Sequence, residues 1–394
     1  MLKKVDVVVI GAGAAGLMCA AQAGKRNRSV LVLDHAKKPG RKILISGGGK
    51  CNFTNYDVSA NNYLCQNPHF VKSCLSQYSN WDFISLVSSY NIAFEEREHG
   101  QLFCIDSAKQ IVNMLLDQCN KSVSFRYQAQ IASINPSQDG FLLEVDNDLI
   151  QCNSLVIATG GLSMPKLGAT SYGYQIAEQF GLKVVTTRAA LVPFTLHKED
   201  KEHMAALSGI AIPVEITATN GQTFKEALLF THRGLSGPSV LQISSYWTAG
   251  QYITIDLLPE VDTALLLAEA VKKHPNQSLK NTLAKVLPKR LVEMLISREE
   301  IDDKPLKQFA GNQLHSISEK LHNWKVLPNG TEGYRTAEVT LGGVDTDGIS
   351  SKTMECKSVA GLYFVGEVLD VAGHLGGYNF QFCWSSGFVA GQNV

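Results

Sequence analysis

The chain has 394 residues, 45% of them apolar and 18% charged, which is the composition of a globular protein with room for two or three domains. The 36 Lys and Arg residues balance the 36 Asp and Glu residues, so bulk charge supports neither nucleic-acid nor membrane binding. The nine cysteines are scattered and include no C-x-x-C pair, which excludes a dithiol redox motif and argues against a zinc site. No apolar run reaches about 18 residues, so we expect a soluble protein. The scattered cysteines suit a reducing compartment, so we also expect a cytoplasmic protein without bound metal.

The first predicted elements form a complete β-α-β unit. Residues 5–10 are a β-branched run typical of a strand buried in a parallel sheet. A helical pattern then reaches about Lys25, and a second strand at 29–33 ends on Asp34. Further along this part of the chain we predict helices at 70–88 and 107–119 and strands at 122–134, 140–145 and 154–158.

The pattern changes near residue 191. Up to about residue 260, short alternating strands predict a small β-barrel or sandwich. Residues 261–335 are mostly helical in period, with breaks at Pro275 and Pro288, and end in a return strand. We therefore expect an α/β protein in which a Rossmann-type domain (1–190 plus 336–394) is interrupted by a β-barrel-like subdomain (191–260) and a helical subdomain (261–335).

A Gly11-x-Gly13-x-x-Gly16 motif lies between the first strand and the first helix. The first glycine permits the tight turn, the second lets the backbone approach a pyrophosphate, and the third lets the helix pack on the strand. The helix N-terminus offers free N–H groups to the phosphates. Asp34 can accept hydrogen bonds from ribose hydroxyls and disfavours a 2′-phosphate. The motif predicts a dinucleotide site without distinguishing FAD from NAD.

Two other glycine-bearing strand ends favour FAD. The run Ala-Thr-Gly-Gly at 158–161 is small where a dinucleotide would cross the sheet, and Gly366-Glu367 follows the last strand. The glycine-rich run 373–379 opens a terminal helix at about 380–391, whose N–H groups can face the flavin pyrimidine oxygens. No second G-x-G-x-x-G follows a strand. We therefore expect NAD(P)H to visit the flavin transiently, or electrons to pass from substrate to oxygen or another acceptor.

This arrangement resembles the glutathione-reductase-type class of FAD proteins. The blocks 40–55 (GRKILISGGGKCNFTN), 230–238, 337–344 and 366–370 are similar to those of the YhiN-like bacterial flavoproteins, also called the BaiN or aminoacetone-oxidase-like family. The resemblance spans essentially the whole chain and implies bound FAD, a β-barrel plus helical insertion, and an oxidoreductase role. Amine oxidation, steroid-type double-bond reduction and uridine reduction in ribosomal RNA belong to different relatives, so the substrate stays open.

The predicted FAD site draws on several segments. Backbone N–H groups of the 40–55 loop, with Arg41, Lys42 and Lys50 nearby, can hold the pyrophosphate, although a flexible basic surface loop is the alternative. Glu367 and Asp370 are better suited to the ribityl chain or the surroundings of the phosphates than to acting as bases. The cofactor-binding residues that we predict are Gly11, Gly13, Ala14, Ala15, Gly16, Asp34, His35, Gly40, Arg41, Lys42, Ser46, Gly47, Gly48, Gly49, Cys51, Asn52, Ala129, Ala158, Thr159, Gly160, Gly161, Gly366, Glu367, Asp370, Gly376, Gly377, Tyr378 and Asn379.

Three residues are candidate catalytic groups. His374 is a titratable group predicted near the flavin ring, with a packed core histidine as the alternative. Cys51 follows Lys50 and could be a low-pKa thiol, but a small buried lining residue is the favoured interpretation. Tyr378 could orient substrate or contribute only through its backbone. In the inserted segment, His232-Arg233 could meet an anionic substrate or be structural.

We expect hydride transfer through flavin N5. The favoured reaction is reduction of an activated or pyrimidine double bond with NAD(P)H, and the RNA version of it predicts a basic surface near the flavin. Lys37, Lys38, Arg41, Lys42 and Lys50 supply such a cluster, which the FAD phosphates explain equally well. The alternatives are oxidation of a small amine by oxygen and a non-enzymatic flavin-binding redox sensor.

Overall fold

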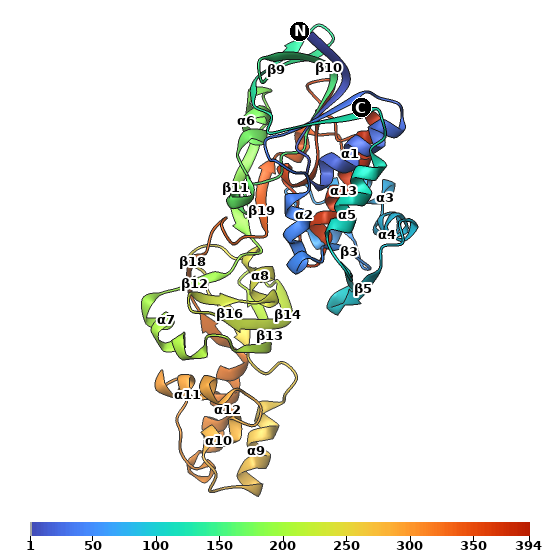
Figure 1. The fold of residues 1–394 in the computed structure, drawn as a ribbon. Helices are drawn as coiled ribbons and strands as arrows, with labels where there is room; N and C mark the ends of the chain where they lie inside the picture. Colours follow the sequence, from blue (N-terminus) through green and yellow to red (C-terminus); the bar gives the residue numbers. More distant parts are fainter. Residues whose placement is uncertain (1) are drawn as a thin grey trace. The chain divides into compact units, whose positions relative to one another are not determined.

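The computed structural model describes residues 2–394, which form two compact units. The first unit combines the N-terminal part of the chain up to Arg188 with Glu338–Val394, and the second is Ala189–Ala337 (Figure 1). Each unit has its own cluster of buried apolar side chains. None of the helices in residues 2–394 combines the length and the apolarity needed to cross a membrane.

The first unit is built on a mostly parallel sheet. Its strands are β1 (Leu2–Ile10), β2 (Val30–Asp34), β7 (Val123–Tyr127), β8 (Ile131–Ser137), β9 (Gly140–Val145), β10 (Asp148–Ile157) and β20 (Leu362–Phe364). The order is β7-β2-β1-β10, and β10 continues in parallel to β20 through its C-terminal half and antiparallel to β9 through its N-terminal half. Val7, Val8 and Val9 are fully buried, as the β-branched pattern predicts for a strand with both faces covered.

Seven α-helices lie in the part of the first unit that the structure describes. They are α1 (Ala14–Lys25), α2 (Arg41–Ile45), α3 (Phe70–Gln77), α4 (Asn80–Ser89), α5 (Lys109–Gln118), α6 (Tyr172–Gln179) and α13 (Tyr378–Asn393). Helix α1 is buried from Ala14 to Gly24 and packs against α13 (Figure 1). A Cβ on Gly387 would lie 2.4 Å from the Ala15 carbonyl oxygen, so the glycine is what lets these two helices approach. The two ends of the chain therefore share one core.

Three small sheets complete the first unit. They are β3 (Asn52–Asn55) with β6 (Gln101–Cys104) and β5 (Phe94–Arg97), β4 (Tyr63–Leu64) with β21 (Ala372–Gly373), and β11 (Val184–Ala190) with β19 (Val339–Val344). The prediction of a loop throughout 40–55 was wrong, because α2 and β3 lie within it. The helical periodicity predicted at 70–88 is confirmed as two helices, because Ser79 interrupts the stretch and caps α4 by accepting the Asp82 N–H.

The second unit contains a seven-stranded antiparallel sheet in the order β17-β16-β13-β14-β15-β12-β18. The strands are β12 (Phe194–Leu196), β13 (Ala211–Ala218), β14 (Thr223–Phe230), β15 (Gly234–Ser236), β16 (Ile253–Asp256), β17 (Trp324–Val326) and β18 (Pro328–Thr331). Only Leu327 separates the two edge strands β17 and β18 along the chain, so the sheet must curl to bring its edges near each other. The helices are α7 (Lys198–Met204), α8 (Pro238–Ser244), α9 (Thr263–Lys273), α10 (Leu279–Leu283), α11 (Lys289–Ser297) and α12 (Gly311–His322).

Candidate active site

The glycine turn between β1 and α1 has the geometry of a phosphate-binding loop. Gly11 has φ +113°, and a Cβ there would lie 2.3 Å from the Ala158 carbonyl oxygen. A Cβ on Gly16 would lie 1.9 Å from the Gly11 carbonyl oxygen. Gly13, in contrast, has nothing within 4 Å of its Cβ position. The first and third glycines are thus required by packing, while the second leaves open space beside the start of α1.

Asp34 lies at the C-terminal end of β2 and organises this turn. One carboxylate oxygen accepts the Ala12 N–H and the other accepts the Ala36 N–H, both at 2.7 Å. Each oxygen keeps a lone pair that a ribose hydroxyl can use. His35 lies beside it with a largely exposed ring, and the Ala129 N–H donates to the Asp34 carbonyl oxygen at 3.0 Å. The structure therefore brings the predicted ribose-side residues to one strand end.

The 40–55 segment combines a short helix with a glycine turn. Gly40 donates its N–H to the Ala12 carbonyl oxygen at 2.8 Å, which ties the segment to the glycine turn of β1–α1. Gly47 and Gly48 are exposed and have φ values of +55° and +66°. Nothing lies within 4 Å of the Gly48 Cβ position. The turn can therefore present bare backbone to a ligand.

The basic residues of this region have separate tasks. The Lys50 ammonium donates to the carbonyl oxygens of Ile105 and Asp106, so it is engaged within the protein. Lys37 and Lys38 are exposed, and Arg41 is half-buried with Nη1 3.3 Å from the Gly168 Cβ position. Of the five cations considered from the sequence, Lys50 is thus bound within the protein, while Lys37 and Lys38 are exposed.

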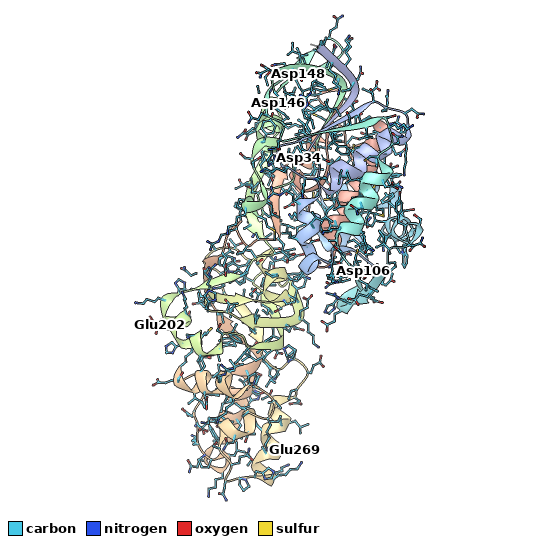
Figure 2. The ribbon with its side chains drawn as sticks, viewed as in Figure 1. Asp34, Asp106, Asp146, Asp148, Glu202 and Glu269 are labelled. Atoms are coloured by element: carbon cyan, nitrogen blue, oxygen red, sulfur yellow. The ribbon has the colours of Figure 1, made fainter. Side chains whose placement is uncertain are left out.

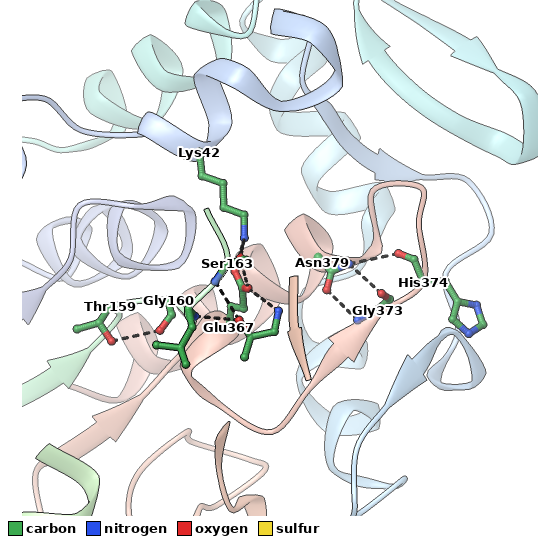
Figure 3. A network of polar contacts seen from close by, with 10 residues as sticks. Lys42, Thr159, Gly160, Ser163, Glu367, Gly373, His374 and Asn379 are labelled. Atoms are coloured by element: carbon green, nitrogen blue, oxygen red, sulfur yellow. Dashed lines mark hydrogen bonds and ion pairs between the residues drawn. The ribbon is translucent and has the colours of Figure 1, made fainter. Parts of the chain in front are cut away.

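Lys42 takes part in a network that connects four segments of the first unit (Figure 3). Its ammonium lies 2.6 Å from Glu367 Oε2 and donates to Ser163 Oγ at 2.8 Å. Glu367 Oε1 accepts from the Ser163 hydroxyl at 2.9 Å and from the Thr340 N–H at 3.0 Å. Thr340 Oγ1 in turn accepts the N–H groups of Leu162 and Ser163. Sequence reasoning found Lys42 and Glu367 but missed Ser163 and Thr340.

The strand end at 158–161 lies against this network. The Ala158 N–H donates to the Ile10 carbonyl oxygen at 2.8 Å, so β10 and β1 end together. Gly160 has φ +74° and open space at its Cβ position, while a Cβ on Gly161 would lie 2.5 Å from Thr340 Oγ1. The Thr159 hydroxyl points to the Gly160 carbonyl oxygen at 3.4 Å. Small residues are thus needed here for packing and leave room on one side.

Asp370 contacts backbone rather than open space. Its Oδ2 accepts the Gln66 N–H at 3.1 Å, its side chain is nearly fully buried, and a backbone hydrogen bond from Gly342 also reaches it. Burial raises the pKa of this carboxyl group. These contacts tie the loop before α3 and strand β19 to Asp370, which gives this residue a structural task.

Cys51 does not have the environment of a reactive thiol. It is completely buried and has φ +53°, and its N–H donates to the Ser46 carbonyl oxygen at 3.0 Å. Burial raises the pKa of the thiol well above its usual range, because the thiolate would lose its hydration. The Lys50 ammonium that was expected to lower this pKa is occupied elsewhere. The structure corrects the low-pKa hypothesis in favour of a buried lining residue.

The segment before α13 is a glycine turn held by the side chains of Asn379 and Asn55. Asn379 accepts the Gly373 N–H at 2.8 Å and donates to the carbonyl oxygens of Gly373 and His374 (Figure 3). Gly376 and Gly377 have φ values of +126° and +94°, and a Cβ on Gly377 would lie 2.5 Å from the Thr54 carbonyl oxygen. The turn is thus fixed in place before the first N–H groups of α13, and Asn379 acts on the backbone.

His374 and Tyr378 lie edge to face, with ring centroids 6.2 Å apart. The His374 ring is directed away from Asn379 (Figure 3). Burial lowers the pKa of His374 from 6.5 to about 4, so the imidazole is neutral near pH 7. Tyr378 is buried, and its carbonyl oxygen accepts the Tyr63 hydroxyl at 2.9 Å. A neutral imidazole and a buried phenol ring therefore sit beside the glycine turn of α13.

These observations match what FAD needs from a protein. The open Gly13 position at the start of α1, Asp34 at the end of β2, the exposed Gly47-Gly48 turn and the Gly160 strand end all belong to one unit. A chain-wide comparison agrees with this geometry, since the family model for the HI0933-like protein Rossmann domain matches residues 5–393. The chain belongs to the HI0933-like family. This HI0933-like protein is an FAD-dependent oxidoreductase.

Curated relatives of this HI0933-like protein cover its full length. It is 57% identical over 394 residues, 100% of the chain and 98% of the relative, to a ribosomal RNA dihydrouridine synthase of Escherichia coli strain K12. The identity is 52%, with 98% of both chains covered, to a ribosomal RNA dihydrouridine synthase of Haemophilus influenzae. It is 27% identical to a 3-dehydro-bile acid delta(4,6)-reductase of Clostridium scindens, over 98% of this chain and 97% of that one.

Solved structures share the fold. A 3-ketosteroid-delta4-(5alpha)-dehydrogenase from Rhodococcus jostii RHA1 superposes with a TM-score of 0.50 at 13% identity and covers 99% of this HI0933-like chain and 97% of its own. A quinol-fumarate reductase reaches 0.51 at 15% identity over 99% of this chain and 70% of its own. At these identities the likeness concerns the fold alone.

Arg233 in the second unit is accounted for by an ion pair. Its Nη1 lies 2.8 Å from Glu332 Oε2, and the carboxylate side chain is only 10% exposed. The pair joins the β14–β15 turn to the segment after β18 in this HI0933-like protein. Arg233 thus has a structural partner, and the structure gives it no task toward an anionic substrate.

Proposed function

We propose that this protein reduces uridine in ribosomal RNA to dihydrouridine, with NAD(P)H as the electron donor. The observation that carries the proposal is the 57% identity over the entire chain to a relative with that activity in its name, together with 52% to a second. The near-zero net charge of the chain is compatible with an RNA substrate, because a local basic surface suffices for phosphate contacts.

The chemistry suits a flavin site. The C5=C6 bond of uracil is conjugated with a carbonyl group, so hydride adds at C6 and a proton at C5. Bound FAD, once reduced by NAD(P)H, would supply the hydride, and the proton at C5 would come from an acid or from water. The bile-acid relative is named as a reductase, a related class of reaction. In this chain, the glycine turn before α13 would direct N–H groups at developing negative charge, and the buried surroundings of His374 and Tyr378 would exclude water.

We propose the following placement of the cofactor on the residues of this chain. The N-terminus of α1 at Gly13 and the Gly47-Gly48 turn would hold the pyrophosphate, and Asp34 would accept from the ribose. The Lys42–Glu367 pair would sit beside the ribityl chain, and Gly376-Gly377 beside the flavin pyrimidine. His374 and Tyr378 would line the reacting end of the flavin.

Two broader points belong to the same proposal. The 40–55 block and the chain-wide match support placing the protein with the YhiN-like flavoproteins, and the curling sheet of the second unit supports a small barrel followed by a helical subdomain. A ribosomal RNA substrate would place the enzyme in the cytoplasm, where ribosomal RNA is made in bacteria.

The test uses ribosomal RNA transcribed in vitro, which contains no modified nucleosides. The holoenzyme is incubated with this RNA and NADPH or NADH, and the digested nucleosides are analysed by mass spectrometry. We expect dihydrouridine in proportion to the NAD(P)H consumed. A flavin that neither NADH nor NADPH reduces, and that yields peroxide with small amines but no dihydrouridine, would instead establish the oxidase alternative.

A further inference from the structure

The part of the second unit from residue 263 to residue 290 is strongly basic in a chain of zero net charge. It contains six Lys or Arg residues and a single acidic residue, Glu269, which Figure 2 labels on α9. The segment comprises α9, α10 and the start of α11. Such a local excess of positive charge attracts polyanions even where the whole protein is neutral.

Ion pairs neutralise only part of this charge. Lys273 pairs with Glu269 at 2.7 Å, and Lys280 lies 3.4 Å from Glu293. Lys272 and Lys285 are exposed, and so is Lys307 from the neighbouring segment. Within residues 2–394, no carboxylate lies within 4.0 Å of these three ammonium groups.

These three lysines border one surface turn, residues 274–278, which follows α9. Lys272 belongs to the last turn of the helix. Lys285 reaches the turn through its ammonium, 3.4 Å from Gln277 Oε1. Lys307 is adjacent through its N–H, which donates to the Pro275 carbonyl oxygen at 2.9 Å. We call Lys272, Lys285 and Lys307 the basic turn.

Folding explains only one of the three charges. Lys272 stabilises the C-terminal end of α9, where a cation is favourable. Lys285 follows the C-cap residue of the five-residue helix α10, and Lys307 lies in a three-residue 3-10 helix, so the dipoles near them are short. Like charges gathered around one turn also repel each other. Exposed lysines without an ion-pair partner are the groups with which proteins contact phosphates.

We propose that the basic turn binds the sugar-phosphate backbone of the RNA substrate; this inference rests on the proposed function. The occupant is RNA rather than an acidic protein, because the proposed substrate itself supplies regularly spaced negative charges. Contacts of this type position an RNA without reading its sequence. The helical part of the insertion thereby acquires a task separate from flavin chemistry.

The test compares two triple variants of the holoenzyme with equal changes in net charge. One is Lys272→Glu/Lys285→Glu/Lys307→Glu. The control is Lys121→Glu/Lys198→Glu/Lys201→Glu, which alters three exposed lysines outside the basic turn. The probe is unmodified ribosomal RNA, and the dissociation constant is measured across a series of salt concentrations. Thermal unfolding and flavin reduction by NADPH report on the integrity of each variant.

We expect the basic-turn variant to bind at least about tenfold more weakly than wild type, with a log–log salt slope smaller by about 2, which corresponds to three lost phosphate contacts. The control keeps the wild-type slope. Equal affinities and slopes for the two variants would overturn the proposal. A second result would also overturn it. If the wild-type protein bound polyglutamate as tightly as RNA, and the basic-turn variant lost both affinities equally, the turn would be a site for acidic proteins.

The outcomes separate this inference from the proposed function. Dihydrouridine formed equally well by wild type and the basic-turn variant, with unchanged RNA affinity, would contradict the inference alone. Absence of dihydrouridine with every form of the enzyme would contradict the proposed function, and the RNA-binding comparison would still decide the fate of the basic turn.

Discussion

The Lys42 ammonium lies 2.6 Å from the Glu367 carboxylate, which joins helix α2 near the N-terminus to the turn after strand β20 near the C-terminus. Ser163 and Thr340 complete the contact from two further segments. One carboxylate thus connects the segment after β10 with the turn after β20, which are two of the three glycine-bearing strand ends proposed to hold FAD. Because this ion pair is partly buried and its carboxylate accepts several hydrogen bonds, it fixes the positions of the two side chains more firmly than an exposed pair would.

Replacing Glu367 with Gln keeps the shape of the side chain and removes the charge that Lys42 faces. We expect FAD to bind about tenfold more weakly, since a charge-assisted hydrogen bond contributes about 1.5–3 kcal/mol and part of it is lost. FAD titration of the apoprotein measures this. The matched control is Glu332→Gln, which breaks the Arg233–Glu332 pair of 2.8 Å in the second unit and should leave FAD affinity unchanged. If Glu367→Gln and Glu332→Gln weakened FAD binding equally, the cause would be a general loss of stability instead.

Gly13 and Gly11 should respond differently to the same substitution. Gly13→Val places its side chain in open space and has an ordinary backbone conformation, with φ −86°. The apoprotein should therefore fold within about 1 kcal/mol of wild type and retain no FAD. Gly11→Val meets the Ala158 carbonyl oxygen at 2.3 Å with φ +113° and should not fold stably. Thermal unfolding and the flavin content of the purified proteins check both, and full FAD content in Gly13→Val would refute the pyrophosphate placement.

Cys51→Ala tests the thiol directly. Because the thiol is buried with a raised pKa, its loss should cost about 1 kcal/mol of stability through the small cavity and leave turnover within about twofold of wild type. A general acid or nucleophile contributes roughly 100-fold or more to the rate. A fall of that size in kcat, with normal FAD content, would restore Cys51 as a catalytic residue.

His374 makes stability depend on pH in a defined window. Its pKa is lowered from 6.5 to about 4 by burial, so between these values the unfolded chain binds a proton that the folded chain refuses. The free energy of unfolding is therefore unaffected by His374 above pH 6.5 and decreases as the pH drops toward 4. The decrease is roughly 2 kcal/mol once the partial exposure of the ring is allowed for. His374→Gln should remove this part of the acid sensitivity. Tm measured at pH 7 and pH 5 for both proteins decides it, and identical pH dependence would contradict the prediction.

The local motifs were predictable from the sequence because their physical requirements are local. Gly11, Gly13 and Gly16 each meet the steric condition expected of them, and Asp34 ends β2 as the β-α-β pattern indicates. Ser163 and Thr340 were not predictable, because their importance comes from contacts with Glu367 over 204 and 27 residues of chain. The roles assigned to the remaining site residues, and the division of the second unit at residue 260, stay predictions.

Cys51 shows why a neighbour in sequence is a poor guide to a pKa. Lys50 adjoins it along the chain, yet the ammonium turns to the carbonyl oxygens of Ile105 and Asp106 while the thiol turns into the core. Burial then dominates the thiol pKa. The carboxylate of Asp370 likewise accepts backbone N–H groups that lie far from it in the sequence, and its place beside the cofactor stays a prediction.

The most direct test of the account is anaerobic stopped-flow spectroscopy of the bound flavin. The enzyme is first reduced with one equivalent of NADPH and then mixed, without oxygen, with unmodified ribosomal RNA. We expect the visible flavin band to return as dihydrouridine forms, and RNA already converted to completion to leave the flavin reduced. A flavin that stays reduced with unmodified RNA and is reoxidised only by oxygen would contradict it.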